Sequence, residues 1–151
     1  MGTRTSATLR RLIACSVVYI VWSLIATAIA IAENRPAGFA GLSTGLPAMQ
    51  DFLYGMGTAM SPPLYYLLAQ VVLTILTPRR DRWGGVGVGG LALFGLFSVI
   101  GALGEPILLE IFNPGAFNIF KALIYTGMIL VPSATLVFAI RARSERLREK
   151  S

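Results

Sequence analysis

The chain has 151 residues, of which 55% are apolar and only 13% are charged, with a formal net charge of +6. Its mean hydropathy of +0.70 and its long apolar runs indicate a membrane protein rather than a soluble domain, in which about 25% of residues are charged. The basic balance does not indicate nucleic-acid binding, because Lys and Arg gather in clusters that flank apolar segments. This length predicts a single membrane domain, 1–151.

Two residue types that are absent or rare limit the kinds of metal, cofactor and catalytic site that the chain can form. The chain has no His and a single Cys, Cys15. Because imidazole and thiolate are the common metal ligands, and imidazole is the usual general base near neutral pH, we expect no metal site within one chain and no cofactor. A lone Cys cannot form an intramolecular disulfide, which excludes a dithiol quinone reductase. No catalytic nucleophile and base pair is visible.

The first apolar segment covers 12–32 and follows a basic start with Arg4, Arg10 and Arg11. It has the ~20 residues that a helix needs to cross the hydrocarbon core. The alternative is a signal peptide cleaved after Ala32, because the preceding residues have the small-x-small form of a cleavage site. The length of the run, which exceeds the core of roughly 7 to 15 residues in signal peptides, favours a retained membrane helix.

The second apolar segment covers 52–76 and is interrupted by Pro62 and Pro63. Two prolines withdraw two backbone donors, so we expect the helix either to kink there or to begin afresh. In the second case a separate interfacial or re-entrant helix covers 46–60, and the membrane helix begins at Pro62. Both arrangements leave carbonyl groups near Thr58 that need partners or a wet cavity.

The third apolar segment covers 86–112. As one continuous helix it would be roughly 40 Å long, which exceeds the ~30 Å of the hydrocarbon core. We therefore expect it to tilt or break, with the break at Glu105 and Pro106. Gly85 and Gly89 near its start have the small-xxx-small spacing that allows close helix packing.

The fourth apolar segment covers 116–140 and leads into a basic tail, 141–151. We expect the tail to be a helical extension that emerges among anionic lipid headgroups and binds them. If four helices alternate, eleven of the thirteen basic residues fall on one side. The positive-inside tendency makes that side cytoplasmic. The sequence thus predicts an all-α integral membrane protein, a bundle of four transmembrane helices in the plasma membrane, of bacterial type, with the N and C termini both cytoplasmic.

The stretch 98–110 carries two carboxylates late in an apolar segment. Small and polar residues share one face of the expected helix: Ser98, Gly101, Ala102 and Glu105. An ionisable group inside a membrane segment is a candidate functional site. Glu105 could relay a proton or cation, because a carboxyl group can be neutral in an apolar site and ionise when water or a cation arrives. The alternative is a hydrated Glu105 at the outer end of a tilted helix.

Glu110 and Lys121 lie symmetrically about the expected turn at 113–118. An antiparallel hairpin would place them at similar depth, where an ion pair would steady the outer end of the hairpin. In the functional alternative, Lys121 is a counter-ion that switches between Glu105 and Glu110.

Three of the expected helices carry polar groups in their outer halves. These faces predict a small polar cavity or ion relay, open to the outer side, and lined by Thr58, Ser61, Tyr65, Glu105, Lys121 and Tyr125. Asp51 would lie at its mouth or be an ordinary interfacial charge. The alternative is that the hydroxyl groups only satisfy backbone or cross-helix hydrogen bonds.

Three functional classes remain open from the sequence. The first is a small multi-pass membrane protein without catalytic machinery, which acts by helix packing as a homo-oligomer or as an accessory subunit of a larger membrane complex. The second is a homo-oligomeric channel or a proton- or cation-coupled transporter that uses Glu105. The third is a membrane-embedded enzyme that acts on a lipid or quinone.

Overall fold

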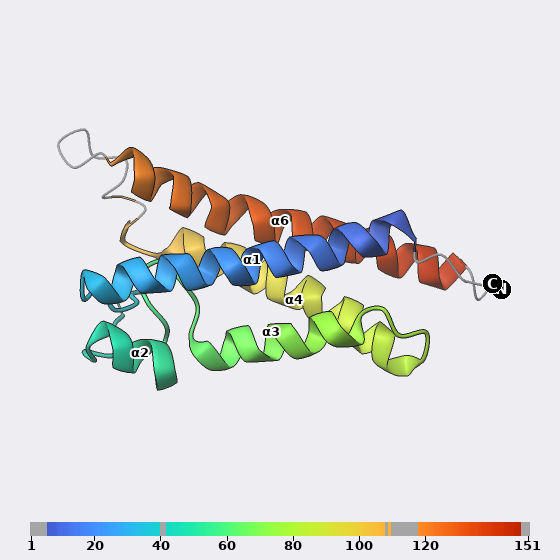
Figure 1. Ribbon diagram of the computed structural model, residues 1–151, viewed down its shortest axis with the longest axis horizontal. Coiled ribbons are helices and arrows are strands. Elements are labelled where there is room, and N and C mark those ends of the chain that lie inside the picture. Colours follow the sequence, from blue (N-terminus) through green and yellow to red (C-terminus); the bar gives the residue numbers. More distant parts are fainter. Residues whose placement is uncertain (1–5, 40–41, 108, 110–117, 149–151) are drawn as a thin grey trace.

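The computed structural model describes residues 6–39, 42–107, 109 and 118–148. The described chain is all α, as predicted, and its only β pairings are isolated bridges. Figure 1 shows the long helices side by side, with one short helix at one end of the bundle. The described part of the chain contains five helices: α1 (Ala7–Ala32), α2 (Ala48–Tyr54), α3 (Leu64–Leu76), α4 (Arg82–Gly104) and α6 (Ile119–Arg148).

Three helices, α1, α4 and α6, are long and apolar enough to cross a membrane. The fourth apolar helix, α3, has only 13 residues. At 1.5 Å per residue it is about 20 Å long, short of the ~30 Å of the hydrocarbon core. By length and composition, three described helices are thus able to span a membrane, and α3 is a shorter apolar companion.

The second apolar segment breaks at its prolines, as predicted, and the helix begins afresh. The continuous helix over 52–76 is therefore not formed. Pro63 precedes the first residue of α3, where its missing N–H costs nothing. The separate helix is shorter than the expected 46–60, because the chain turns at Gly55 and at Gly57, whose φ of +110° is a conformation that favours glycine.

The helix of the third apolar segment, α4, ends where the break was predicted, at Glu105 and Pro106. Helix α4 begins at Arg82, earlier than the expected residue 86, because the Asp81 carboxylate caps it by accepting hydrogen bonds from the N–H groups of Trp83 and Gly84. This cap makes the glycine-rich stretch the first turns of α4.

The fourth apolar segment and the described part of the basic tail form one helix. Helix α6 runs for 30 residues from Ile119 to Arg148 and contains Pro132 without a break. The described part of the tail, 141–148, is therefore a helical extension of the fourth segment, as predicted. The start of the segment, 116–117, lies outside the described residues.

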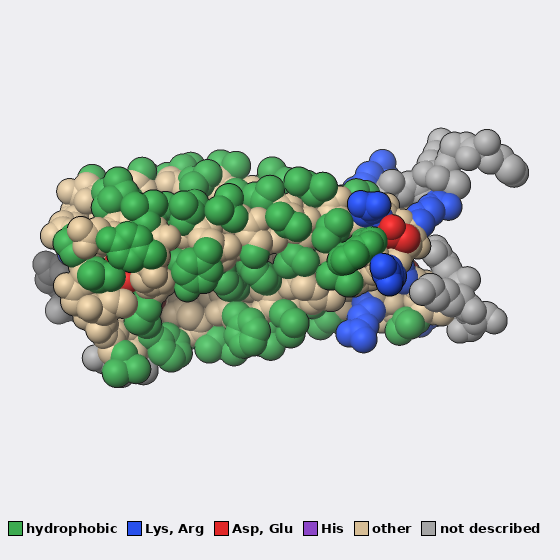
Figure 2. Space-filling view, turned by 90° about the horizontal axis from the view of Figure 1, so that it is seen from below, with side chains coloured by type: hydrophobic (Ala, Val, Ile, Leu, Met, Phe, Trp, Pro, Cys, Tyr) green, Lys and Arg blue, Asp and Glu red, His purple; other side chains and the backbone are tan. Residues whose placement is uncertain are grey.

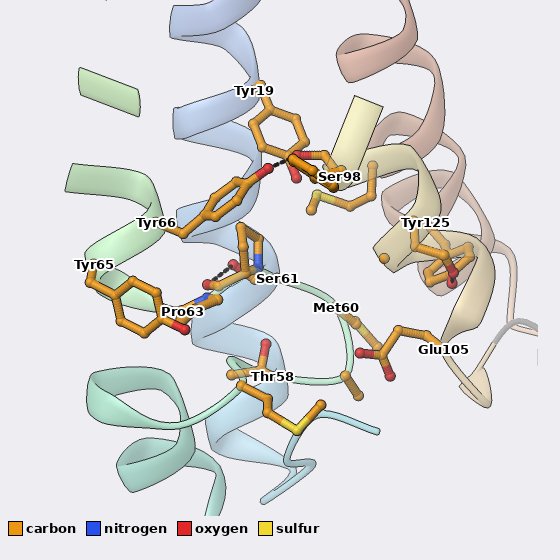
Figure 3. Close-up of a pocket in the computed structure, with 17 residues that line it drawn as sticks. Tyr19, Thr58, Met60, Ser61, Pro63, Tyr65, Tyr66, Ser98, Glu105 and Tyr125 are labelled. Atoms are coloured by element: carbon orange, nitrogen blue, oxygen red, sulfur yellow. Dashed lines mark hydrogen bonds between the residues drawn. The ribbon is translucent and has the colours of Figure 1, made fainter. Parts of the chain in front are cut away.

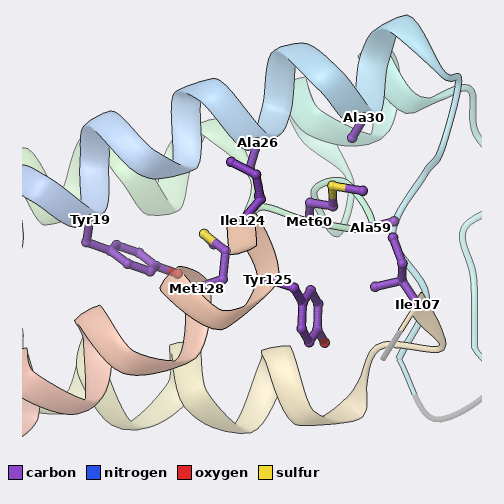
Figure 4. Close-up of a cluster of buried hydrophobic side chains, with 9 residues drawn as sticks. All are labelled: Tyr19, Ala26, Ala30, Ala59, Met60, Ile107, Ile124, Tyr125 and Met128. Atoms are coloured by element: carbon purple, nitrogen blue, oxygen red, sulfur yellow. The ribbon is translucent and has the colours of Figure 1, made fainter. Parts of the chain in front are cut away.

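Two apolar clusters hold the helices together. One joins α1, α4 and α6 toward the chain termini and consists of Leu9, Leu12, Val88, Leu91, Ala139 and Ala142. The other lies toward the opposite end and is shown in Figure 4: Tyr19, Ala26, Ala30, Ala59, Met60, Ile107, Ile124, Tyr125 and Met128. Helix α1 contributes to both clusters, so both depend on the first apolar segment.

The two ends of the bundle differ in charge. Lys and Arg side chains gather at one end of the face in Figure 2, and apolar side chains cover most of the rest. We call this the basic end; it contains the turn between α3 and α4 and both ends of the described chain (Figure 1). The opposite, loop end contains the α1–α2 connection and α2. The apolar outer faces, with Val21, Ile75 and Leu130 more than half exposed, suit a lipid environment.

Candidate functional site

A buried carboxylate, Asp51, organises the loop end. Its Oδ2 atom accepts a hydrogen bond from the Ala37 N–H at 2.9 Å, and its Oδ1 atom accepts one from the Met56 N–H at 2.7 Å. The side chain is fully buried. Asp51 therefore ties the chain after α1 to the chain after α2. Neither expected role, a charge at the cavity mouth or an ordinary interfacial charge, matches this burial.

The irregular segment 55–63 follows, and hydrogen bonds within the loop end satisfy much of its backbone. The Thr58 N–H donates to the Ser61 carbonyl at 2.8 Å, and the Ser61 N–H donates to the Thr58 carbonyl at 3.1 Å. The Ala59 N–H donates to the Arg35 carbonyl at 3.2 Å. The Thr58 carbonyl group thus has the hydrogen-bond donor that the proline break was expected to require. Non-helical backbone is tolerated at membrane depth where it is buried in protein or lines a cavity.

A cavity of about 290 Å³ lies against this segment and is bounded by side chains of α1, α3, α4 and α6 (Figure 3). Its wall is mainly apolar, with several aromatic side chains: Tyr19, Tyr65, Tyr66, Phe97 and Tyr125. Of the six residues that the sequence predicted in the cavity wall, the structure brings five together there: Thr58, Ser61, Tyr65, Glu105 and Tyr125.

Glu105 is the only charged side chain among the described residues of the cavity wall. It lies immediately after the last residue of α4, and its Oε2 atom accepts a hydrogen bond from the Gly38 N–H at 3.1 Å. The pKa of Glu105 is raised to about 7, mainly by burial, with a smaller rise from the Asp51 charge and an opposing fall from the Gly38 hydrogen bond. Figure 3 shows the carboxylate beside Met60. A carboxyl group in this state can hold or release a proton near neutral pH.

Lys121 is not among the described residues that line the cavity. Its Nζ atom lies 2.7 Å from Glu33 Oε2, and the same oxygen lies 3.0 Å from Arg35 Nε. The Lys121 contact lowers the pKa of Glu33. The other predicted partner, Glu110, lies outside the described residues. The end of α1 and the start of α6 lie together, which a hairpin argument confined to 110–121 could not show.

Sequence reasoning missed a polar group between α1 and α3. Gln70 Nε2 donates a hydrogen bond to Ser16 Oγ at 3.0 Å, and Ser16 Oγ lies 2.7 Å from Thr74 Oγ1. All three side chains are buried. The available signal was Gln70, an amide in the apolar run 64–76, at helical spacing from Thr74.

A second polar group reaches the cavity from α3 and α4. The Tyr66 hydroxyl donates a hydrogen bond to the Phe94 carbonyl at 2.8 Å and lies 3.1 Å from Ser98 Oγ. The Tyr19 hydroxyl lies within interaction range of Ser98 and Ser23. Figure 3 shows Tyr19, Tyr66 and Ser98 converging on one side of the cavity.

Comparison with protein-family models, curated proteins and solved structures finds no match to this chain. The part of the chain that the structure describes contains no group of three or more His, Cys, Asp or Glu side chains placed to hold a metal ion. The polar and aromatic groups in the described cavity wall are one carboxyl group, several hydroxyl groups and aromatic rings. These groups can bind a ligand and exchange a proton.

Proposed function

We propose that the protein binds a small lipophilic organic cation in the loop-end cavity, with Glu105 as its counter-ion, and exchanges that cation for the Glu105 proton. The observation that carries the proposal is a single carboxyl group in the described cavity wall, which is otherwise uncharged, mainly apolar and carries several aromatic side chains. This function belongs to the coupled-transporter class that the sequence left open. It needs neither a metal ion nor a catalytic nucleophile.

The chemistry of the wall selects the ligand class. Aromatic rings bind organic cations through their faces, and quaternary ammonium groups are the best-known ligands of such cages. A buried carboxylate needs a partner of opposite charge or a proton. The cavity can therefore hold a proton on Glu105 or a cation beside it. A volume of about 290 Å³ suits a ligand with one aromatic ring and a small ammonium head.

Binding of benzyltrimethylammonium to the protein in lipid nanodiscs tests the proposal. This cation does not titrate, so any pH dependence comes from the protein. With a Glu105 pKa of about 7, the ionised fraction, and with it the affinity, should rise about tenfold between pH 6 and pH 8. Glu105→Gln should weaken binding and remove the pH dependence. Equal binding of neopentylbenzene, the neutral isostere, would contradict the ligand class.

Gly101 offers a way to block the cavity without disturbing the helices. It lines the cavity, and a Cβ atom added there would meet no described atom within 4 Å. Gly101→Leu should therefore reduce benzyltrimethylammonium binding while leaving thermal stability unchanged. Val86→Leu on the same helix, at an exposed position that does not line the cavity, is the control that should bind normally.

The membrane topology is part of the same proposal. We propose that α3 and segment 55–63 together complete a fourth crossing, which places the basic end and both termini in the cytoplasm of a bacterial cell. The support is the basic end itself, which suits anionic lipid headgroups. With Cys15→Ser as background, Ser43→Cys should react with an impermeant maleimide in intact cells and Ser144→Cys should not. The opposite labelling would overturn the topology.

A second candidate function, assembly by helix packing, has one observation in its favour. An added Cβ atom at Gly85 or Gly89 would meet no described atom within 4 Å, so this small-residue face of α4 is open in the single chain. We propose that it packs against a second copy or a larger membrane partner. Native mass spectrometry should show an oligomer or a stoichiometric companion that Gly89→Leu releases. A monomer without companions would contradict it.

A further inference from the structure

We propose that a buried polar seam between α1, α3 and α4 carries protons between the cavity and the basic end of the bundle. The seam consists of Ser16, Tyr19, Ser23, Tyr66, Gln70, Thr74 and Ser98. This inference rests on the proposed function in one respect, which is that Glu105 exchanges its proton with the cavity. It adds a route by which that proton can cross the apolar interior.

The seam begins in the cavity wall. Tyr19, Tyr66 and Ser98 line the cavity together with Glu105. A hydroxyl group donates one hydrogen bond and accepts others, so a row of hydroxyl groups can pass a proton along by taking one and giving another. The contact of 3.1 Å between the Tyr66 hydroxyl and Ser98 Oγ is such a step.

The seam continues in the Ser16, Gln70 and Thr74 group. Gln70 Nε2 donates to Ser16 Oγ, Ser16 Oγ contacts Thr74 Oγ1, and Thr74 Oγ1 donates to the Gln70 carbonyl at 2.8 Å. The whole group is buried. Polar side chains at this depth are costly unless they are paired or hydrated.

One helical turn separates the two groups, since Tyr66 and Gln70 are four residues apart on α3 and Ser16 and Tyr19 are three apart on α1. Residues at these spacings are neighbours, with about 5–6 Å between their Cβ atoms. The two groups therefore follow one another on the same faces of α1 and α3, and we propose that water joins their polar atoms.

The orphaned end of Gln70 places that water. Among the described residues, the buried Gln70 Oε1 atom has no hydrogen-bond partner. Exchanging the two ends of the amide would still leave one of them unpaired, because Ser16 contacts only the other end. A buried polar atom without a protein partner is normally paired with an ordered water. We therefore assign a water to the free end of Gln70, where it would link the Tyr66 and Ser98 hydroxyl groups to the Ser16 and Thr74 hydroxyl groups.

The seam ends near a cation. Thr77 follows Thr74 by about one turn, and Arg146 Nη2 donates hydrogen bonds to the carbonyl groups of Thr77 at 2.7 Å and Arg79 at 3.0 Å. Asp81 pairs with Arg79 at 3.4 Å. A fixed guanidinium at this exit repels protons, so we expect Arg146 to limit the rate of passage.

Proton flux into liposomes tests the seam. The purified full chain is reconstituted, a potassium gradient with valinomycin sets the membrane potential, and an enclosed pH dye reports proton entry. Wild type should conduct protons, Gln70→Leu should lower the flux at least tenfold, and Arg146→Gln should raise it severalfold. Thr135→Val is the matched control: its buried hydroxyl bonds to the Val131 carbonyl of its own helix, so flux should not change. Flux equal to wild type in Gln70→Leu would overturn the proposal.

Cation binding distinguishes failure of the seam from failure of the cavity. Gln70 does not line the cavity, so Gln70→Leu should still bind benzyltrimethylammonium with the wild-type pH dependence. Absence of proton flux in wild type would overturn the seam and leave cation binding standing. Flux without cation binding would overturn only the ligand class. If Gln70→Leu does not fold, Thr74→Val, which removes the neighbouring hydroxyl, should lower the flux in the same way, and unchanged flux there would overturn the seam.

Discussion

The two ends of the bundle differ in how their apolar side chains pack. At the basic end, Leu, Val and Ala side chains interlock, and glycines of α4 bring backbones into direct contact: an added Cβ atom at Gly87 would lie 2.6 Å from the Thr77 nitrogen. At the loop end, Tyr and Met side chains surround a cavity, and Gly101 faces open space. Close packing resists deformation, whereas flexible Met side chains adapt to a ligand. We therefore infer that the basic end supports the fold and that the loop end binds the ligand.

The largest expected effect comes from separating helices α4 and α6. An added Cβ atom at Gly95 would lie 2.8 Å from the Pro132 carbonyl oxygen and 2.9 Å from the Leu136 nitrogen, both of which are backbone atoms. Gly95→Leu should therefore destabilise the protein by about 3 kcal/mol or more. Gly89→Ala, on the open face of the same helix, should cost nothing. Denaturation in mixed micelles measures the stability of both variants. Equal stabilities would contradict the close contact between α4 and α6 at Gly95.

The next effect concerns the carboxylate that organises the loop end. Asp51→Ala leaves the Ala37 and Met56 N–H groups without their acceptor, which should cost about 3 kcal/mol. Asp51→Asn keeps one acceptor oxygen and should recover about half of that loss. The same denaturation experiment applies. If Asp51→Ala left the free energy of unfolding unchanged, segment 55–63 would hold its place without this side chain.

Glu105 should make the loop end sensitive to pH. Its pKa is about 7 in the fold against 4.5 ordinarily, so the folded state holds its proton longer than the unfolded state. Stability should fall as pH rises from 4.5 to 7 and then level off. Because the group is only partly buried, we expect a loss of about 1–2 kcal/mol rather than the full linkage value. Glu105→Gln should remove this dependence, and its persistence in that variant would assign it to another group.

The smallest effect should come from the ion pair at the loop end. Glu33 and Lys121 are partly exposed, so their contact should contribute at most about 1 kcal/mol. The pKa of Glu33 is lowered, so this stability is present above its ordinary 4.5 and is lost as pH falls through the lowered value. A double-mutant cycle with Glu33→Gln and Lys121→Met measures the coupling. Purely additive losses would count against direct pairing.

Local periodicity predicted much of this architecture. Hydropathy located the long helices, the missing N–H groups of Pro62 and Pro63 located a break, and Pro106 located the end of α4. Helical spacing also brought Ser98, Gly101 and Glu105 to one face, and all three line the cavity. Each of these inferences uses residues within a few turns of one another, where the sequence alone determines the geometry.

Contacts between distant segments were beyond that reasoning. Lys121 pairs with Glu33, which lies 88 residues away, and Ser16 meets Gln70 across 54 residues. Both contacts depend on the relative register of two helices, which packing along their whole length determines. The extent of α2 was missed for another reason, because the turn at Gly57 is supported by its bond to the carbonyl of Asp51, itself buried by tertiary contacts.

Proton release on cation binding is the most direct test of the central claim, that one carboxyl group holds either a proton or a cation. Benzyltrimethylammonium is added to the protein in weakly buffered nanodiscs at pH 6, and the released protons are titrated. With a Glu105 pKa of about 7, wild type should release about one proton per bound cation, and Glu105→Gln should release none. Binding without proton release in wild type would contradict the account.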